Sequence, residues 1–285
     1  MRKLNKKEQK WVEKVVETLK MGGRSKTTIH NYVHAINRFL KHYKENTNFK
    51  DFNEEKIASY IKREYIDKGY SGSTYNVNIC AIKFLYSVCF NREFNKRKLP
   101  SVKLRKVIPA IIDKPTFIKI FNGEKNVKYK CWLLLGFCSG LRVEEIAQIK
   151  IENINSKEHK LKIIGKGNKE RFTILPDITI KYLRLYYKTA NFNKNNDYLF
   201  EGAGEREYTN SKYITNYFSI LKKKYNLPNN LSFHSLRHSF ATYFIKAGGD
   251  PFVLKNMLGH QSLNTTSIYI HLGRDFNNIE GIKYD

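Results

Sequence analysis

Apolar side chains recur every three or four positions in four stretches of the first hundred residues, which is the spacing of one face of an α-helix. The stretches cover about residues 6–20, 25–40, 53–61 and 71–88. Ser25 opens the second stretch, and a serine side chain can cap the free backbone N–H groups at a helix start. The pattern therefore predicts a small bundle of four helices.

Beyond residue 112 the pattern is helical again and then changes its period. Pro115 suits the first turn of a helix, and an apolar run covers residues 129–138. Apolar and polar residues then alternate in short segments, which is typical of β-strands with one covered face. We expect a three-stranded antiparallel sheet from residues 149–151, 161–163 and 172–174. The predicted fold class is mainly α with a small antiparallel β-sheet, that is, α+β.

Residues 232–271 predict three more helices. The first has apolar residues at helical spacing and ends at Gly248 and Gly249, because glycine accepts the left-handed conformation of a helix end. Asp250 caps the second, which ends at Gly259, and Ser262 caps a short third helix. The two short helices also fit an ordinary helix-turn-helix, which would read DNA without any chemistry.

The charge of the chain indicates a polyanionic partner. The formal net charge is +26, and the sequence pI is about 9.8. Residues 1–110 carry 25 Lys and Arg against 10 Asp and Glu, and the remainder carries 27 against 16. AT-rich coding also enriches lysine, but it supplies glutamate as well and does not explain an excess of this size. A protein that surrounds DNA from two sides would be charged in this way.

The segment from Lys96 to Lys106 has six basic residues and no acidic one, and Pro100 within it and Pro109 just after it interrupt any helix. Its charge suits a linker that lies along a DNA backbone, and a solvated hinge without contacts is the alternative. The predicted organisation is an N-terminal DNA-binding domain at 1–105, a basic linker at 106–112, and a second domain at 113–285 with a C-terminal tail at 272–285.

The cysteines and the apolar runs indicate an intracellular protein. The four cysteines lie in apolar helical contexts without close CxxC spacing, so we expect reduced core residues: Cys80, Cys89, Cys131 and Cys138. No apolar run approaches the ~18 residues of a membrane span. The N-terminus leads into a polar helix and not into a signal sequence. We expect a cytoplasmic, nucleoid-associated protein.

Several residues have types that handle phosphate chemistry, and each has an ordinary structural reading when taken alone. An arginine can be a surface residue in an ion pair, and a histidine can cap a helix. The chain has 19 tyrosines, so most of them must be structural. The glycine-lysine segment at 165–169 lacks the order of a P-loop, so nucleotide hydrolysis is not indicated. The residues in question are Arg142, Lys166, His234, Arg237, His260 and Tyr269.

Taken together, these six residues resemble the tyrosine recombinase (phage integrase) family in type and order. The motifs Leu258-Gly259-His260 and Thr265-Thr266-Ser267-Ile268-Tyr269 look most like those of its Xer branch. Gly140-Leu141-Arg142 followed by Glu145 resembles the first catalytic box of that family. The resemblance implies a four-helix SAM-like core-binding domain followed by a catalytic domain.

The resemblance also implies a role for each residue. Tyr269 is the nucleophile, two arginines hold the scissile phosphate, and Lys166 protonates the leaving 5′-oxygen. His234 acts as acid or base near the tyrosine, and His260 donates a hydrogen bond to the phosphate. Lys166 and Lys169 could exchange their roles. Glu145 belongs to the supporting shell, and the expected DNA backbone contacts are Lys103, Arg105, Lys106, Lys169 and Arg171.

The activity implied is site-specific recombination of double-stranded DNA through a 3′-phosphotyrosine intermediate and a Holliday junction, without metal, ATP or another cofactor. An Xer-like resolvase and a small mobile-element integrase both fit. A type IB topoisomerase-like strand transferase is one alternative, because it uses similar residues. A non-catalytic DNA-binding protein of the same fold is the other.

The expected assembly is a homotetramer on two sites with paired half-sites, formed from monomers that are free in solution. In the tail, apolar residues recur at every third position: Phe276, Ile279 and Ile282. A helix this short is not stable alone in water. We expect the tail to dock on a neighbouring protomer in the DNA-bound tetramer, with a disordered or permanently intramolecular tail as the alternative.

Overall fold

The computed structural model describes residues 2–44, 47–95, 97–104, 108–165, 170–190, 197–204, 206–260 and 266. The chain divides into two compact units, Met1–Lys106 and Val107–Asp285, and each is described by itself. The described residues are mainly helical and include one small antiparallel sheet, which confirms the predicted fold class. None of the described helices is long and apolar enough to span a membrane.

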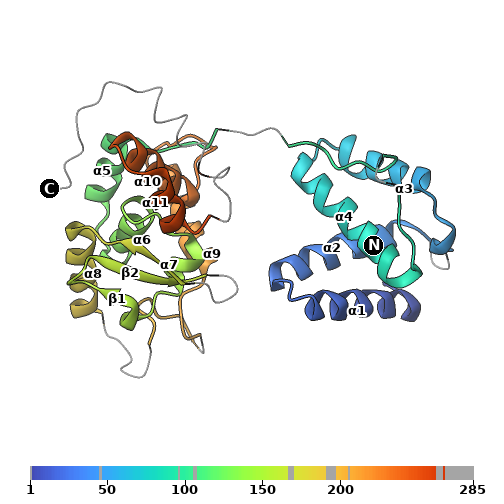
Figure 1. Cartoon of the computed structure of the whole chain (residues 1–285), viewed down its shortest axis with the longest axis horizontal. Helices are drawn as coiled ribbons and strands as arrows, with labels where there is room; N and C mark the ends of the chain where they lie inside the picture. The colour runs from blue at the N-terminus through green and yellow to red at the C-terminus, as the bar shows by residue number, and fades with distance from the viewer. Residues whose placement is uncertain are drawn as a thin grey trace. The chain divides into compact units, whose positions relative to one another are not determined.

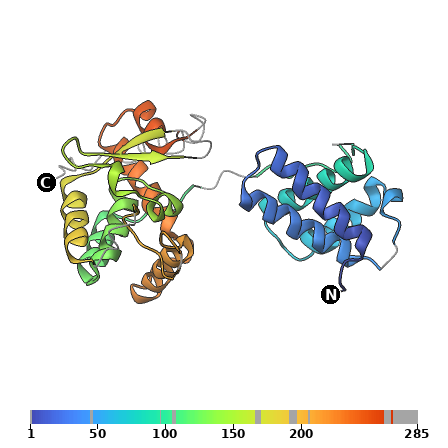
Figure 2. The same ribbon diagram turned by 90° about the horizontal axis from the view of Figure 1, so that it is seen from below.

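The first unit contains the four expected helices, α1 (Lys6–Met21), α2 (Lys26–His42), α3 (Glu54–Ile61) and α4 (Gly72–Phe90). Helix α4 packs against both α1 and α2, which lie side by side (Figures 1 and 2). A turn of 3₁₀-helix, η1 (Phe49–Asp51), precedes α3, and a π-helical turn, η2 (Lys62–Ile66), extends it. Each of the four helices begins with a side-chain oxygen that accepts the backbone N–H three residues later: Asn5, Ser25, Asn53 and Ser71.

The basic segment after α4 is packed against the first unit for part of its length. Leu99 is buried in the core of that unit. The side chain of Asn76 on α4 donates to the carbonyl of Val102 at 2.9 Å and accepts its N–H at 2.8 Å. At the other end, Ile112 is buried in the second unit, and its N–H donates to Ser239 Oγ at 2.8 Å. Leu99 and Val102 are therefore held by the first unit, and Ile112 is held by the second.

The second unit is built around one buried helix, α6. Its side chains from Cys131 to Leu135 are all buried, and the helix packs against α8 on one side and α10 on the other. A Cβ on Gly136 would lie 3.0 Å from Leu236 Cδ1, so glycine at this position favours the close approach of α10. The helices of this unit are α5 (Lys114–Gly123), α6 (Val127–Phe137), α7 (Val143–Ala147), α8 (Asp177–Thr189), α9 (Ser211–Lys224), α10 (Phe233–Lys246) and α11 (Pro251–Leu258).

The sheet has three antiparallel strands in the order β1 (Ile154–Asn155), β2 (Lys160–Ile164) and β3 (Glu170–Ile174). The expected first strand at 149–151 was wrong. The chain there forms an isolated bridge between Lys150 and Tyr198 and then a 3₁₀ turn, η3 (Ile151–Asn153). The first strand therefore begins three residues beyond the expected segment, because the backbone of Ile149 and Ile151 forms hydrogen bonds with residues 197–199 and not with β2.

Strand β3 turns its polar residues inward. Phe172 is 55% exposed, although its alternation with polar neighbours is typical of a covered position. Thr173 is buried, and its Oγ1 donates to the carbonyl of Ser139 at 2.7 Å. Arg171 lies on the same inner face, where helix α11 packs against the strand. On the inner face of β3, hydrogen bonds from Arg171 and Thr173 thus replace apolar packing.

The expectation that all four cysteines lie in the core was wrong for Cys80. Cys131 is buried within α6, whereas Cys80 on α4 is exposed, and Cys89 and Cys138 are intermediate. The thiols of all four are free. The pattern was misleading because α4 is apolar around most of its circumference, and position 80 falls on the side that its partner helices leave open.

Candidate active site

The turn before α7 places an arginine at the start of that helix. Gly140 has a φ of +67°, and a Cβ at this position would lie 2.4 Å from a ring carbon of Phe240, so only glycine fits the turn. Arg142 follows as the N-cap residue of α7. Its backbone N–H donates to Glu145 Oε2 at 2.8 Å, and its Nη1 donates to Glu145 Oε1 at 2.8 Å. The Arg142 side chain remains about one-third exposed, at 34%.

Glu145 is the shared partner of three arginines. Beyond its two bonds with Arg142, its Oε2 accepts from Arg171 Nη2 at 2.8 Å and lies 3.8 Å from Arg237 Nη1. Burial alone would raise the pKa of this carboxyl, but the hydrogen bond and charge of Arg171, together with the other donors, lower it below its usual value. The side chain is therefore a carboxylate at neutral pH and holds the guanidinium groups together.

Arg237 lies deepest in this cluster. Its side chain is only 3% exposed, on the inner side of α10. Nη1 donates to the carbonyl of Gly140 at 2.7 Å, and Nη2 donates to the carbonyl of Leu258 at 2.7 Å. Arg142 Nη1 approaches the same Leu258 carbonyl at 3.3 Å. The last carbonyl of α11 therefore brings both arginines to one place, as cations are favoured at a helix C-terminus.

His260 follows α11 directly and faces Arg237. Gly259 ends the helix in the left-handed conformation, with a φ of +63°, as expected from the sequence. His260 Nε2 lies 3.3 Å from Arg237 Nη2, and His260 Nδ1 lies 3.0 Å from Thr266 Oγ1. Burial, together with the charges of the nearby arginines, lowers the pKa of this imidazole to about 4. His260 is therefore neutral at pH 7.

His234 lies in the first turn of α10, three residues before Arg237, as the sequence predicted. The residue keeps part of its surface exposed, and its ring lies 6.2 Å from the ring of His238, measured between centroids. Lost hydration, followed by the charge of Arg237, lowers the pKa of His234. A neutral imidazole at this exposed position can accept a proton or, once protonated, return it.

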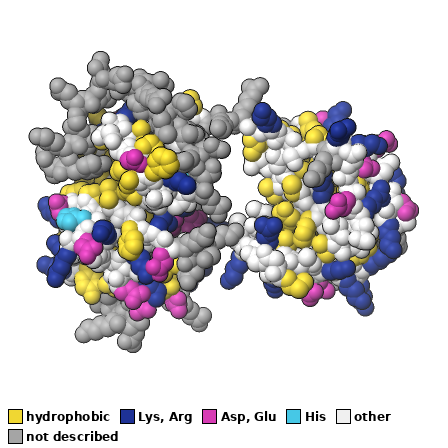
Figure 3. Space-filling model, viewed as in Figure 1, with side chains coloured by type: hydrophobic (Ala, Val, Ile, Leu, Met, Phe, Trp, Pro, Cys, Tyr) yellow, Lys and Arg dark blue, Asp and Glu magenta, His cyan; other side chains and the backbone are white. Residues whose placement is uncertain are grey.

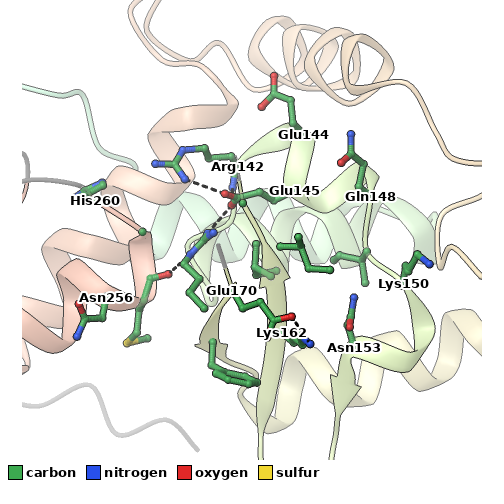
Figure 4. A pocket seen from close by; sticks show the side chains of 18 of the residues that line it. Arg142, Glu144, Glu145, Gln148, Lys150, Asn153, Lys162, Glu170, Asn256 and His260 are labelled. Carbon is green, nitrogen blue, oxygen red and sulfur yellow. Dashed lines mark hydrogen bonds and ion pairs between the residues drawn. The ribbon is translucent and has the colours of Figure 1, made fainter. Parts of the chain in front are cut away.

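An open groove of about 1480 Å³ runs past this cluster, between α7, the hairpin of β2 and β3, and α11 (Figure 4). Figure 4 shows Arg142 and Glu145 pointing toward one another, with His260 beside them. Lys150 lies on the far side of the groove, and Lys162 forms an ion pair at 2.7 Å with Glu170, the first residue of β3. Arg142, Arg171 and His260 line one end of this groove, so an anion there would meet positive charge.

The role of Arg171 was not indicated by the sequence. We expected a DNA backbone contact, and that contact stays a prediction. In the structure Arg171 Nε donates to the carbonyl of Met257 at 2.8 Å while Nη2 binds Glu145. A Cβ on Gly259 would lie 2.9 Å from Arg171 Cδ, so the arginine packs against the turn that positions His260. Strand β3 is thereby joined to both α7 and the end of α11.

Other predicted site residues lie outside the described part of the chain: Arg105, Lys106, Lys166, Lys169, Tyr269, the Ser262-capped helix and the tail at 272–285. Lys103 is described and exposed, beside the segment that packs on α4. Within the described ranges, no group of three or more His, Cys, Asp and Glu side chains could hold a metal ion. The structure thus brings together Arg142, Glu145, Arg237 and His260, with His234 on the adjoining turn.

Glu145→Gln should destabilise the second unit by roughly 2 kcal/mol at pH 7, since it removes charged hydrogen bonds from a nearly buried cluster. The folded-state pKa of Glu145 is lowered, so its stabilising effect is present above its usual pKa of about 4.5. The effect disappears as the pH falls through the lowered folded-state pKa. Urea unfolding of the wild type and the variant from pH 7 to pH 3 measures this.

The neighbouring Glu144→Gln is the matched control, because Glu144 is exposed and is adjacent on the same helix. We expect this variant to unfold like the wild type at every pH. A difference between Glu145→Gln and the wild type that stays constant down to pH 3 would contradict the assigned role of the carboxylate.

Comparison with known families assigns both units. Residues 107–275 match the family described as "Phage integrase family". Residues 11–96 match "Phage integrase, N-terminal SAM-like domain". The two matched regions correspond to the two compact units, apart from the ends of the chain and a short connecting stretch.

Curated relatives include Xer recombinases of bacteria and archaea. Tyrosine recombinase XerA of Pyrococcus horikoshii is 30% identical over 90% of this chain and 87% of its own length. Tyrosine recombinase XerD of Staphylococcus epidermidis is 28% identical, covering 86% of this chain and 88% of that protein. Tyrosine recombinase XerD of Staphylococcus saprophyticus is 32% identical over 62% of this chain, and this match covers 60% of that protein.

Solved structures share the fold. The XerH site-specific recombinase bound to palindromic difH substrate in a post-cleavage complex aligns with a TM-score of 0.72 and 21% identity, over 93% of this chain and 81% of that chain. A lambda integrase tetramer bound to a Holliday junction aligns with a TM-score of 0.69 and 17% identity, over 89% of this chain and 77% of that chain. At these identities the likeness concerns the fold.

Proposed function

The chain belongs to the phage integrase family of tyrosine recombinases, and we propose that it cuts and rejoins double-stranded DNA at specific sites through a 3′-phosphotyrosine intermediate. One observation carries the proposal: two arginines from distant parts of the sequence converge on the carbonyl of Leu258, beside a neutral histidine. This is a cluster of donors aimed at a single position, which suits an anion with several oxygens.

The two arginines would bind the non-bridging oxygens of the scissile phosphate. A phosphodiester under attack gains charge on these oxygens, and preorganised donors stabilise that charge most when water is excluded. Arg237 is buried and fixed by two carbonyls, so it is preorganised, whereas the partly exposed Arg142 would meet the incoming DNA first. Each guanidinium can donate two parallel hydrogen bonds.

The remaining chemistry is assigned by position in the sequence. Tyr269 would attack the phosphorus and form the phosphotyrosine bond, and Lys166 would give a proton to the 5′-oxygen that leaves. His234, which is neutral at pH 7, would take the phenol proton or return it during rejoining. The energy of the broken phosphodiester is kept in the phosphotyrosine bond, so rejoining by the freed 5′-hydroxyl is the reverse of cleavage.

Both units would contact the duplex, the first as a core-binding domain and the second as the catalytic domain. Lys and Arg side chains are spread around the edge of the first unit, with fewer acidic side chains between them (Figure 3). Cations at many positions suit the regularly spaced phosphates of a duplex. We propose a monomer in solution and a homotetramer on two sites with paired half-sites, in line with the tetramer of the structural relative.

A DNA substrate with a nick near the cleavage site tests the enzymatic proposal, because the cut fragment diffuses away and traps the covalent adduct. The target sequence is first identified by sequencing DNA that the purified protein binds. We expect a covalent adduct on this substrate and Holliday junctions on intact paired sites. An adduct without Holliday junctions would indicate a topoisomerase-like strand transferase, and DNA binding without any adduct would contradict the enzymatic proposal.

DNA binding should weaken steeply with salt. Each phosphate neutralised by lysine or arginine releases bound counterions, so six to ten contacts would reduce affinity roughly 10³–10⁵-fold between 50 and 200 mM salt. Titration of a labelled duplex by fluorescence anisotropy at several salt concentrations gives the slope. A flat response would show that the net charge of +26 does not serve DNA binding.

A further inference from the structure

The two ring nitrogens of His260 have partners of different kinds. Nε2 lies 3.3 Å from Nη2 of Arg237, and a guanidinium nitrogen can only donate. Nδ1 lies 3.0 Å from Oγ1 of Thr266, and a hydroxyl can donate or accept. Thr266 is buried, with none of its surface exposed. Both ends of the imidazole are therefore held by specific contacts.

These contacts determine which nitrogen carries the proton. Nε2 must accept, because Arg237 has no lone pair to offer it. A neutral imidazole has one N–H, so the proton is on Nδ1, which donates to Thr266 Oγ1. The DNA-free protein thus holds His260 in the Nδ1–H form, whereas a hydrogen bond from Nε2 to a phosphate oxygen requires a proton on Nε2.

We propose that Thr266 is a positioning residue for His260, one that keeps the ring in place while its proton moves from Nδ1 to Nε2 as the phosphate binds. The proposal rests on the proposed function and deepens it. One proton leaves Nδ1 for solvent and another reaches Nε2 from solvent, so the ring stays neutral. The Thr266 hydroxyl then rotates and donates to Nδ1, which becomes an acceptor.

The position of Thr266 in the sequence adds a second effect. Thr266 is three residues before Tyr269, and His260 is bonded to the buried Arg237. The bond between Thr266 and His260 therefore ties the segment that carries the nucleophile to the residue that binds the phosphate. Loss of the hydroxyl should impair cleavage through this bond, although no step of the reaction is assigned to Thr266 itself.

The charged groups around His260 favour a shift of tautomer over protonation of the whole ring. The groups that face it come from three elements, namely Arg142 at the start of α7, Arg171 on β3, and Arg237 and His238 on α10, and Thr266 contacts Nδ1. Three positive charges near the ring oppose a further one, and burial acts in the same direction, so the pKa is about 4.

Nitrogen-15 NMR of the histidine side chains tests the proposal, since the two tautomers have distinct nitrogen shifts. In DNA-free wild-type protein at pH 7 we expect His260 as the Nδ1–H form, with slow exchange of that proton. With a DNA duplex bound by the uncleaving Tyr269→Phe variant, we expect the Nε2–H form. An Nε2–H form in the free protein, or no change on DNA binding, would overturn the proposal.

Variants at Thr266 test the role of the hydroxyl. Thr266→Val keeps the shape and removes the hydroxyl, and we expect faster Nδ1 proton exchange and a loss of cleavage of roughly fivefold to tenfold, the effect of one hydrogen bond. Thr266→Ser keeps the hydroxyl and should restore both readouts. Thr179→Val on α8 is the matched control, since Thr179 is also fully buried and does not line the groove.

The outcomes separate this proposal from the proposed function. Equal cleavage by Thr266→Val and Thr266→Ser, or equal Nδ1 exchange in both, would overturn the role of Thr266. If the wild type formed no covalent adduct, the enzymatic proposal would fail, while the tautomer of His260 in the DNA-free protein could still be read. If Thr266→Val does not fold, the wild-type tautomer before and after DNA binding decides.

Discussion

Replacing Tyr269 with phenylalanine is expected to abolish the covalent protein–DNA adduct while DNA binding stays nearly unchanged. The substitution removes one oxygen atom, and that atom is the proposed nucleophile. The groups proposed to hold the phosphate are on α7, on α10 and after α11, and the substitution leaves them in place. Denaturing gel electrophoresis of the protein with the nicked substrate measures the adduct, and fluorescence anisotropy measures the affinity.

Tyr284→Phe is the control for this experiment, because Tyr284 is the next tyrosine in the C-terminal part of the chain. We expect this variant to form the adduct at the wild-type rate. If Tyr269→Phe still formed an adduct and Tyr284→Phe did not, the nucleophile would have to be reassigned to Tyr284.

Arg237→Lys should reduce cleavage on the order of 10²-fold or more, the typical effect of losing one preorganised donor in a transition state. Arg237 donates in separate directions, to Gly140, Leu258 and His260, while it is almost fully buried. A lysine is a compact charge without the planar fork, so it cannot reproduce these contacts and bind a phosphate as well. Single-turnover cleavage with saturating protein isolates this effect from weaker DNA binding.

Arg184→Lys is a matched control, because Arg184 on α8 is exposed and makes a single hydrogen bond with Ser156. It should cleave at the wild-type rate. Thermal unfolding of Arg237→Lys must accompany the kinetics, because the substitution leaves buried carbonyls without a donor. Cleavage near the wild-type rate by folded Arg237→Lys would exclude the proposed role of Arg237.

Much of the helical architecture could be predicted because local signals decide it. The caps at Ser25 and Asp250 and the left-handed glycine at Gly259 act within one turn of the chain, and all three are present. The first β-strand was misplaced because the backbone of Ile149 and Ile151 forms hydrogen bonds with residues 197–199, an effect that depends on tertiary structure. Alternation alone cannot distinguish these two environments.

In the candidate site, too, some features could be predicted from local sequence and others depend on tertiary structure. Arg142, Glu145, Arg237 and His260 could be selected by their order and surroundings, and the structure brings these four together. The inward orientation of Arg171 could not be foreseen, because it reverses the apolar and polar faces expected for β3. That reversal depends on a carboxylate 26 positions earlier and a carbonyl 86 positions later in the sequence.

The sequence separations within the cluster also determine when the protein can first bind a phosphate. Arg237 donates to a carbonyl 97 residues earlier, and Arg142 approaches one 116 residues later. Contacts of such range form late, after most of the domain has collapsed. A chain still on the ribosome, with α11 not yet made, already contains Arg142. It lacks His260 and the Leu258 carbonyl that Arg142 and Arg237 both approach. The cluster proposed to bind the phosphate is therefore complete only after synthesis has passed His260.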